Sequence, residues 1–369
     1  MAKYNAANTR IKREYFQYLK EAMRRDESSI DGVAKALARF EEANGFKDFR
    51  KFHREQAKAF KHKLAEEINV RTKQPLSRAT VHSALSALRT FFIWLAGQPG
   101  YKSKIAYDDA NYFNLSDKEV RIAKAARHKP VPSLDQIHHV LSIMPAATGI
   151  EKRNRALVAF AILTGARDGA LASFKLRHVD LVEGVAHQDA RDVRTKGSKT
   201  FSTWFFPVGG DALQIVTDWC QHLRNELLWG EGDPLFPKTE IGLGENGGFV
   251  PIGLSRDGWK TTGPVRDIFR AAFEAAGLPY FNPHSFRNTL VQLGERIAPT
   301  TEVFKSWSQN LGHEKMLTTL NSYGFVLPHR QAELIRGLNC EENSPESLLQ
   351  SPEVRRLLAI ISEQRGTVK

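Results

Sequence analysis

Apolar residues recur at helical spacing through much of the chain, and the segment 77–97, SRATVHSALSALRTFFIWLAG, is the clearest case. Ser77 suits the N-cap of a helix here, and Gly97 suits the position just after its last turn. The apolar positions between them are separated by four, three, four and three residues, which places them on one helix face: Val81, Leu85, Leu88, Phe92 and Leu95. The segment therefore predicts one long helix with a buried face.

The rest of the first third also predicts helices. One is expected over 9–42, with a break near Asp26–Ser29, and another over 47–68. The helical period is lost between 98 and 132, where AKAARHKPVPS contains two prolines and predicts a linker at 124–132. We expect residues 1–128 to form a helical bundle.

The pattern after the linker predicts a mixed domain over 129–337. Around the turn KGSK, VAHQDARDVRTKGSKTFSTWFFPV predicts a β-hairpin or short meander. The Gly-rich segment 238–258 is interpreted as an irregular exposed insertion, because its lone GxG lacks the context of a phosphate loop. One face of the helix over 211–228 is expected to carry Leu213, Val216, Trp219, Leu223 and Leu227. Helices are predicted over 133–143, 151–164, 211–228, 264–276, 284–297, 300–310 and 314–322, with another in the tail 338–369. The fold class that follows is mainly α, with a small β-hairpin or meander.

The charge of the chain is unevenly distributed. The formal net charge is +12, and residues 1–130 hold 27 Lys and Arg against 15 Asp and Glu, whereas 131–369 hold 26 against 26. A positive surplus confined to one segment favours a polyanion, and we expect double-stranded DNA. The residues expected to contact its backbone are Lys51, Arg54, Lys58, Lys61, Arg78 and Arg89. An anionic membrane surface stays an alternative partner, as does a merely solubilising charge.

The remaining composition excludes other classes of protein. No apolar run is long enough to span a membrane, and the N-terminal segment lacks the apolar core of a secretion signal. Only two cysteines are present, which predicts a reducing, cytoplasmic location. The chain has no HExxH, paired-carboxylate or CxxC motif, so we expect no metal and no other cofactor.

Polar residues at the ends of apolar segments suit phosphoryl transfer on DNA without a metal. Two arginines, Arg167 and Arg287, could hold the non-bridging oxygens of a phosphodiester and stabilise the charge of the transition state. Tyr323 could attack phosphorus and form a covalent intermediate. A lysine, Lys196, could protonate the leaving oxygen. Histidines, His284 and His313, could exchange protons; each residue taken singly also has an ordinary structural explanation.

Four motifs in this order, LTGAR, TKGSK, HSFR and LGHEKMLTTLNSY, resemble those of the tyrosine recombinase (phage integrase) family. The resemblance covers about 133–336, and the preceding basic segment resembles the SAM-like core-binding domain of that family by position and charge. Its catalytic positions fall on Arg167, Lys196, His284, Arg287, His313 and Tyr323, with Lys199 a weaker candidate for the lysine. Two positions depart from the family pattern. Ala170 stands where an acidic residue is common, and Tyr323 follows His313 by ten residues, one more than in many members.

The resemblance implies a site-specific recombinase that serves a mobile element. It implies a 3′-phosphotyrosyl intermediate, two domains that clamp a duplex, and a homo-tetramer on paired sites, with accessory DNA-bending or directionality proteins as further partners. The helix around 345–362 resembles segments that protomers of this family exchange. Three alternatives stay open: a DNA-binding regulator that has lost the chemistry, a type IB topoisomerase, and a nuclease.

Overall fold

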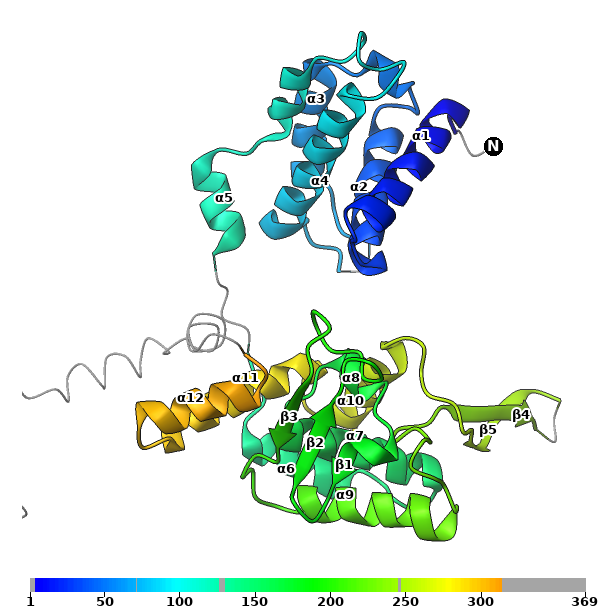
Figure 1. The fold of residues 1–369 in the computed structure, drawn as a ribbon, viewed down its shortest axis with the longest axis vertical. Helices are drawn as coiled ribbons and strands as arrows, with labels where there is room; N and C mark the ends of the chain where they lie inside the picture. Colours follow the sequence, from blue (N-terminus) through cyan, green and yellow to red (C-terminus); the bar gives the residue numbers. More distant parts are fainter. Residues whose placement is uncertain (1–3, 71, 126–129, 245–246, 314–369) are drawn as a thin grey trace, which may run out of the picture. The chain divides into compact units, whose positions relative to one another are not determined.

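The computed structural model describes residues 4–70, 72–125, 130–244 and 247–313. The chain divides into two compact units, Met1–Arg127 and His128–Lys369. Figure 1 shows the helical first unit and the second unit with its small sheets. Tyr323, the helix predicted over 314–322 and the tail 338–369 lie outside the described residues. No described helix combines the length and the apolar character that crossing a membrane requires.

The first unit is a helical bundle whose helices begin where the sequence places capping side chains. The Asp26 side chain caps α2, and the Ser77 hydroxyl accepts a 3.1 Å hydrogen bond from the Thr80 N–H at the start of α4. A π-helical turn over Tyr18–Ala22 extends α1. The helices are α1 (Ala6–Gln17), α2 (Glu27–Ala43), α3 (Arg54–Glu66), α4 (Arg78–Ala96) and α5 (Asp117–Lys124), with 3-10 turns over Phe49–Lys51 and Tyr107–Phe113.

Aromatic side chains fill the core of the first unit. Phe52 and Phe92 stack with ring centroids 3.7 Å apart, and Phe40 and Phe113 also contact this pair. All five apolar positions predicted for the face of α4 are buried. Burial of this aromatic cluster is therefore a main source of stability in the unit.

Two predictions for the first unit are wrong in detail. The helix predicted over 47–68 begins only at Arg54, because the preceding residues form a 3-10 turn and an extended connection. The segment 98–132 was expected to be irregular, yet it contains α5, which starts at a capping box of Ser116 and Glu119. This helix is eight residues long and has no buried side chain, so it begins through its capping box rather than through a buried face.

The second unit surrounds the buried helix α7. Residues Ala156–Thr164 of α7 are all buried, and α9 packs along this helix. A three-stranded antiparallel sheet in the order β1-β2-β3 adjoins the helices, and the pairing of β2 with β3 confirms the predicted hairpin. The helices are α6 (Leu134–Ile143), α7 (Gly149–Thr164), α8 (Asp168–Leu171), α9 (Ala212–Gln221), α10 (Gly263–Ala275), α11 (Pro283–Ile297) and α12 (Thr301–Asn310). The strands are β1 (Val179–Asp180), β2 (Val185–Gln188), β3 (Phe201–Trp204), β4 (Thr239–Leu243) and β5 (Phe249–Leu254).

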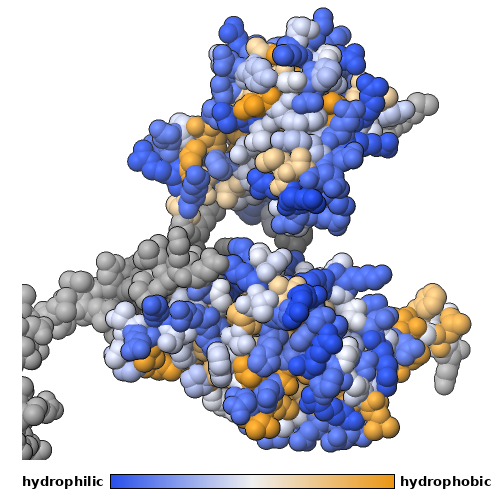
Figure 2. Space-filling view, in the orientation of Figure 1, coloured by the Kyte–Doolittle hydropathy of each residue, from blue (hydrophilic) through white to orange (hydrophobic). Residues whose placement is uncertain are grey.

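The Gly-rich segment 238–258 is exposed, as predicted, but it is not irregular. Strands β4 and β5 pair in it as an antiparallel hairpin that projects from the unit. Its large side chains face solvent, with Phe249 81% exposed, and Figure 2 shows the apolar surface that results. Gly242 and Gly244 leave room for Ile252 and Val250 on the facing strand, which is why a glycine-rich sequence can still form a strand here.

The face predicted for the helix over 211–228 also needs correction. Val216, Trp219 and Leu223 are buried, whereas Leu213 is 48% exposed. The segment ends in a π-helical turn, His222–Glu226. Leu213 lies one residue after the buried Ala212 at the first turn of α9, and a rotation of about 100° per residue places it at the exposed edge of the buried face.

Candidate active site

The corner that follows α7 provides the base of the site. Helix α7 ends at Gly165, whose φ of +58° is a left-handed conformation that favours glycine. A Cβ at this position would lie 2.8 Å from Leu311 Cδ2 and 3.0 Å from Leu290 Cδ1, so a side chain would also collide with the core. The glycine therefore lets three segments distant in sequence pack closely, and it directs its carbonyl toward α11.

Arg287 lies at the centre of these segments. Its side chain is 2% exposed, on the first turns of α11, which the Asn282 side chain caps. Nη1 donates to the Gly165 carbonyl at 2.6 Å, and Nη2 donates to the Leu311 carbonyl at 2.5 Å. Nη2 also contacts His313 Nε2 at 2.8 Å. The two carbonyls and the imidazole are neutral acceptors, so these three bonds satisfy the guanidinium donors without neutralising its charge.

The contact with Arg287 defines the state of His313. A guanidinium can only donate, so His313 Nε2 must accept and the ring proton must lie on Nδ1. Burial, followed by the charges of Arg287 and Arg167, lowers the pKa of His313 to about 4. Smaller contributions come from His284 and Lys199. His313 is therefore neutral at pH 7 and can donate a hydrogen bond from Nδ1.

This lowered pKa predicts a loss of stability in acid. Since the pKa of His313 is near 6.5 in the unfolded chain and about 4 in the folded chain, the unfolded state binds more protons between these values. The stabilisation is complete above pH 6.5 and is lost as the pH falls through 4, by on the order of 3 kcal/mol. Thermal unfolding measured from pH 7 to pH 4 should show a smaller decline in His313→Gln than in the unaltered chain. An equal decline in both would contradict this assignment.

His284 lies on the first turn of α11, three residues before Arg287. Desolvation by the surrounding protein lowers its pKa to about 4, and the charges of Arg287, Arg167 and Lys196 add to this effect. The Asp168 carboxylate acts in the opposite direction. Although the residue is exposed at the surface of the site, its ring is thus neutral at pH 7 and is able to accept a proton.

Arg167 is half-buried at the N-cap of α8, directly after the Gly165 corner. Two carboxylates, those of the adjacent Asp168 and of Glu151 in α7, have other partners. Asp168 forms an ion pair with Arg266 of α10, and Glu151 accepts the backbone N–H groups of Ala147 and Thr148. Ala170 is 1% exposed, so the position that departs from the family pattern is part of the core.

The two lysines of the β2–β3 connection act electrostatically on the two histidines. Lys196 is one of the charges that lower the pKa of His284, and Lys199 is one of those that lower the pKa of His313. The turn between them contains Gly197 and Ser198, both with positive φ. The structure thus brings together six of the seven candidate positions, which we name the charged cluster: Arg167, Lys196, Lys199, His284, Arg287 and His313.

Some of the residues predicted to contact DNA are exposed, and others already form ion pairs or hydrogen bonds within the first unit. Lys51 and Arg78 are exposed, and Arg54 forms an ion pair with Glu55. Lys58 pairs with Glu55 and lies over the Tyr112 ring. Two of them donate to the second 3-10 turn or to the residue that follows it: Arg89 to the Asn111 side chain within the turn, and Lys61 to the Asn114 carbonyl at 3.0 Å.

Two arginines that the sequence did not single out, Arg194 and Arg266, bind the segments around the charged cluster. Arg266 pairs with Asp168, and Arg194 donates to the Ala172 carbonyl just after α8 and to the Trp259 carbonyl in the segment before α10. Arg194 stands two residues before Lys196, and this proximity was the only signal in the sequence. Within the described residues, no group of three or more His, Cys, Asp or Glu is placed to hold a metal ion.

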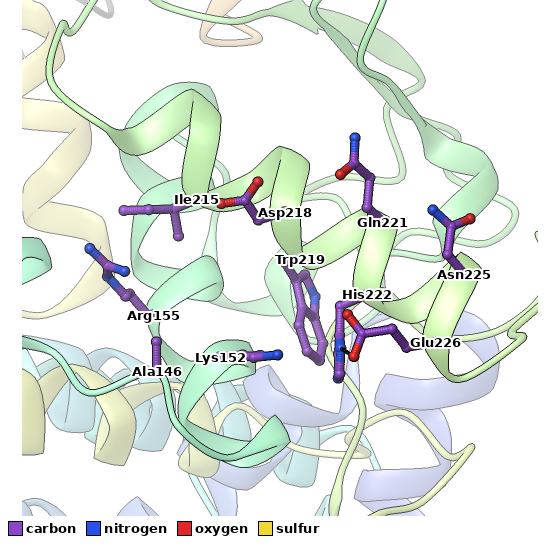
Figure 3. A pocket seen from close by; sticks show the side chains of 10 residues that line it. All are labelled: Ala146, Lys152, Arg155, Ile215, Asp218, Trp219, Gln221, His222, Asn225 and Glu226. Carbon is purple, nitrogen blue, oxygen red and sulfur yellow. Dashed lines mark ion pairs between the residues drawn. The ribbon is translucent and has the colours of Figure 1, made fainter.

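A separate cavity of about 420 Å³ lies between the start of α7 and α9 (Figure 3). Its described lining includes Lys152, Trp219 and the ion pair of His222 with Glu226, whose Nδ1 and Oε2 are 2.7 Å apart. Arg155, also in the lining, donates from Nε to the Leu141 carbonyl at 2.9 Å. None of the described lining residues belongs to the charged cluster, so the two features are distinct.

Comparison with known proteins places the chain in a family. Residues 133–328, more than half of the chain, match the model of the phage integrase family. Tyrosine recombinase XerC of Escherichia coli O127:H6 is 32% identical over 162 residues, which cover 44% of this chain and 47% of the relative. XerC of Lactobacillus leichmannii is 27% identical over 267 residues, covering 71% of this chain and 77% of the relative.

The chain matches several of the curated relatives over less than half of their length. For Tyrosine recombinase XerC 2 of Ralstonia nicotianae, the match covers 42% of the relative. Among solved structures, a lambda integrase (75–356) dimer bound to a COC′ core site superposes with a TM-score of 0.58. Its sequence identity is 15%, and the alignment covers 85% of this chain and 93% of that one. This likeness confirms the predicted fold class, mainly helical with small antiparallel sheets. The chain belongs to the phage integrase family, the family of the tyrosine recombinases.

Proposed function

We propose that this protein is a site-specific DNA recombinase that cuts and rejoins double-stranded DNA through Tyr323. The Tyr323 hydroxyl attacks a backbone phosphorus, a Tyr–O–P bond forms, and the P–O5′ bond breaks. The phenolic proton is transferred to a base, and the departing 5′ oxygen takes a proton from an acid. The product is a 3′-phosphotyrosyl bond with a free 5′-hydroxyl, which retains the bond energy needed for rejoining.

The observation that carries this proposal is the charged cluster itself. Two arginines and two lysines lie around two histidines that are neutral at pH 7. Such an arrangement fits a phosphodiester, whose charge increases at the equatorial oxygens as the transition state forms. Arg167 and Arg287 hold the non-bridging oxygens, with His313 Nδ1–H as a further donor. His284 accepts a proton, and Lys196 protonates the leaving oxygen.

The arginines supply the positive charge that a metal ion would otherwise provide, so the proposed reaction uses neither metal nor other cofactor. Lys199 is the alternative acid, because it lies three residues after Lys196 in the same connection and its charge also reaches the cluster, at His313. The two assignments can be separated by removing each lysine singly and comparing rates of cleavage on one duplex.

We assign DNA binding to both units. Residues 1–128 act as a core-binding domain that grips the phosphate backbone, and 129–337 form the catalytic domain. The lambda integrase structure is a dimer on a core site, and XerH has been solved on its difH substrate. From the resemblance to the family, we further propose that this protein acts as a homo-tetramer on paired sites in the cytoplasm. The tail 338–369 then carries a helix exchanged between protomers, and accessory DNA-bending proteins assist a reaction that serves a mobile element.

The basic face of the first unit leads to a quantitative prediction. Replacing Lys51, Lys58 and Lys61 with Ala should weaken DNA binding about equally on every sequence, because these lysines neutralise phosphates rather than read bases. Each lost contact reduces the slope of log K against log salt by about 0.9. Because Lys58 and Lys61 already have partners within the unit, a reduction smaller than three contacts is expected.

A matched control removes three exposed lysines elsewhere in the unit, Lys102, Lys104 and Lys118. This variant has the same change in net charge, so it separates local contacts from the overall field of the protein. Fluorescence anisotropy with two duplexes of unrelated sequence at several salt concentrations measures both quantities. A change in sequence preference in the first variant would contradict the assignment of these lysines to the backbone.

The proposed function is tested by trapping the covalent intermediate. The protein is expressed in cells that carry its target, the lysate is denatured rapidly with detergent, and DNA that remains attached to the protein is sequenced. Mass spectrometry of the digested protein identifies the modified peptide. We expect adducts at one discrete site, attached to the peptide that contains Tyr323. Adducts spread over the genome would indicate a topoisomerase, and a lack of adducts would indicate a regulator without catalytic activity.

A further inference from the structure

The lysine of the proposed mechanism stands in an exposed connection. Lys196 lies between β2 and β3, in a turn where the Ser198 N–H donates to the Thr195 carbonyl at 3.3 Å. Thr195 Oγ1 also donates to the Lys199 carbonyl at 2.7 Å. These bonds shape the turn internally, but they do not attach it to the rest of the unit. A general acid must be held near the atom it protonates, so another contact has to fix the turn in place.

Asp192 of the same connection pairs with Lys175 and Arg177, and Arg194 makes the attachment nearer to Lys196. Its Nη1 donates to the Lys260 carbonyl at 2.5 Å, and its Nη2 donates to the Trp259 carbonyl at 2.7 Å and the Ala172 carbonyl at 3.2 Å. The planar guanidinium can satisfy several carbonyls at once, which the single ammonium group of a lysine cannot do in the same geometry. The fork therefore joins the lysine turn to the end of α8 and to the segment before α10.

The backbone of Arg194 is also hydrogen-bonded to the residues at the end of α8. Its N–H donates to Ser173 Oγ at 2.9 Å, and Ser173 Oγ donates in turn to the Gly169 carbonyl at 2.9 Å. Gly169 lies so close that a Cβ on it would be 3.2 Å from the Arg194 carbonyl oxygen. Because α8 begins directly after Arg167, these contacts connect the position of Lys196 to that of the first arginine of the charged cluster.

We propose that Arg194 is a positioning residue that holds Lys196 in reach of the leaving 5′ oxygen. The inference rests on the proposed function, because it takes Lys196 as the acid. In the cleavage step, the Tyr323 oxygen bonds to phosphorus, the P–O5′ bond breaks, and the Lys196 ammonium gives its proton to O5′. Without the fork, the bond from the Arg194 N–H to Ser173 remains, but the turn is held less firmly and the proton arrives more slowly, while Arg167 and Arg287 still hold the phosphate.

The test compares two DNA substrates that differ in one atom. Both are duplexes that carry the cleavage site recovered from the trapped adducts, and one has sulfur in place of the bridging 5′ oxygen. A thiol is far more acidic than an alcohol, so the sulfur departs as a thiolate without needing a proton. We expect Arg194→Met to form the adduct on the ordinary duplex about 100-fold more slowly, as general acid catalysis contributes at least this much. On the sulfur duplex, the same variant should react nearly as fast as the unaltered protein.

Three control variants distinguish a displaced acid from a simple loss of charge. Lys196→Met should show the same selective rescue. Arg191→Met, in the same connection but paired with Asp189 among the described residues, should show no loss on either duplex. Arg194→Lys keeps the charge but loses the fork, so it should behave like Arg194→Met. If it instead retains the rate of the unaltered protein, Arg194 serves as a charge for DNA and the inference is overturned.

Loss of rate on both duplexes in Arg194→Met would also overturn the inference, since it would indicate a damaged site rather than a displaced acid. The same holds if Arg194→Met loses no rate on the ordinary duplex. Thermal unfolding of each variant shows whether the unit is intact. Failure of the proposed function is recognised separately, because the unaltered protein would then form no adduct at Tyr323 on either duplex.

Discussion

Replacing Tyr323 with Phe should abolish the covalent protein–DNA adduct and leave DNA binding unchanged. The substitution removes one oxygen atom, which is the proposed nucleophile, and preserves the volume and the apolar character of the ring. The positive charges of the cluster and of the first unit are unaltered, so the affinity for a duplex should stay within about twofold, since that affinity is dominated by phosphate contacts. Adduct formation is measured on denaturing gels and binding by anisotropy on the same duplex.

Tyr280 supplies the matched control for this substitution. It lies in the second unit shortly before α11, with the Arg270 guanidinium 4.9 Å from its ring centroid. Tyr280→Phe removes the same atom from the same unit and should leave adduct formation intact. An adduct that persists in Tyr323→Phe would show that another residue attacks phosphorus. The result also decides whether a tyrosine ten positions after His313 can react, because one added residue rotates a helical position by about 100°.

Replacing Arg287 with Lys should reduce cleavage and stability together. Lysine keeps the charge, but its single ammonium cannot reach the Gly165 carbonyl, the Leu311 carbonyl and His313 Nε2 in the geometry of the fork. Each buried acceptor left without a donor costs about 1–3 kcal/mol, so a loss of roughly 3 kcal/mol in unfolding free energy is expected. The rate of adduct formation should fall by about 100-fold to 1,000-fold, the usual effect of removing one donor that stabilises a transition state.

Arg296→Lys is the matched control on the same helix, because Arg296 is exposed in the last turn of α11. It should change neither the unfolding midpoint in denaturant nor the rate of cleavage. The two effects of Arg287→Lys can be separated by measuring the rate well below the unfolding midpoint. If Arg287→Lys were as stable and as active as the unaltered protein, the guanidinium would be neither a structural centre nor a catalytic group.

The local structure of this protein could be predicted because local causes produce it. Ser77 and Asp26 start helices through hydrogen bonds to N–H groups two or three residues away, and Gly165 ends α7 through its own backbone conformation. The alternation around KGSK predicted the pairing of β2 with β3 for the same reason. The strands β4 and β5 could not be predicted, since their apolar side chains face solvent and follow no burial pattern.

The sequence by itself determined the order of the motifs, the basic character of the first unit and the residues available for chemistry. Only the tertiary structure decided how these residues act on one another. Arg287 meets the Gly165 carbonyl across 122 positions of the chain, and Asp168 meets Arg266 across 98. His284 and His313 are neutral because burial and nearby cations act on them together. Desolvation and Coulomb interactions depend on distances in the folded chain, and positions along a sequence do not specify those distances.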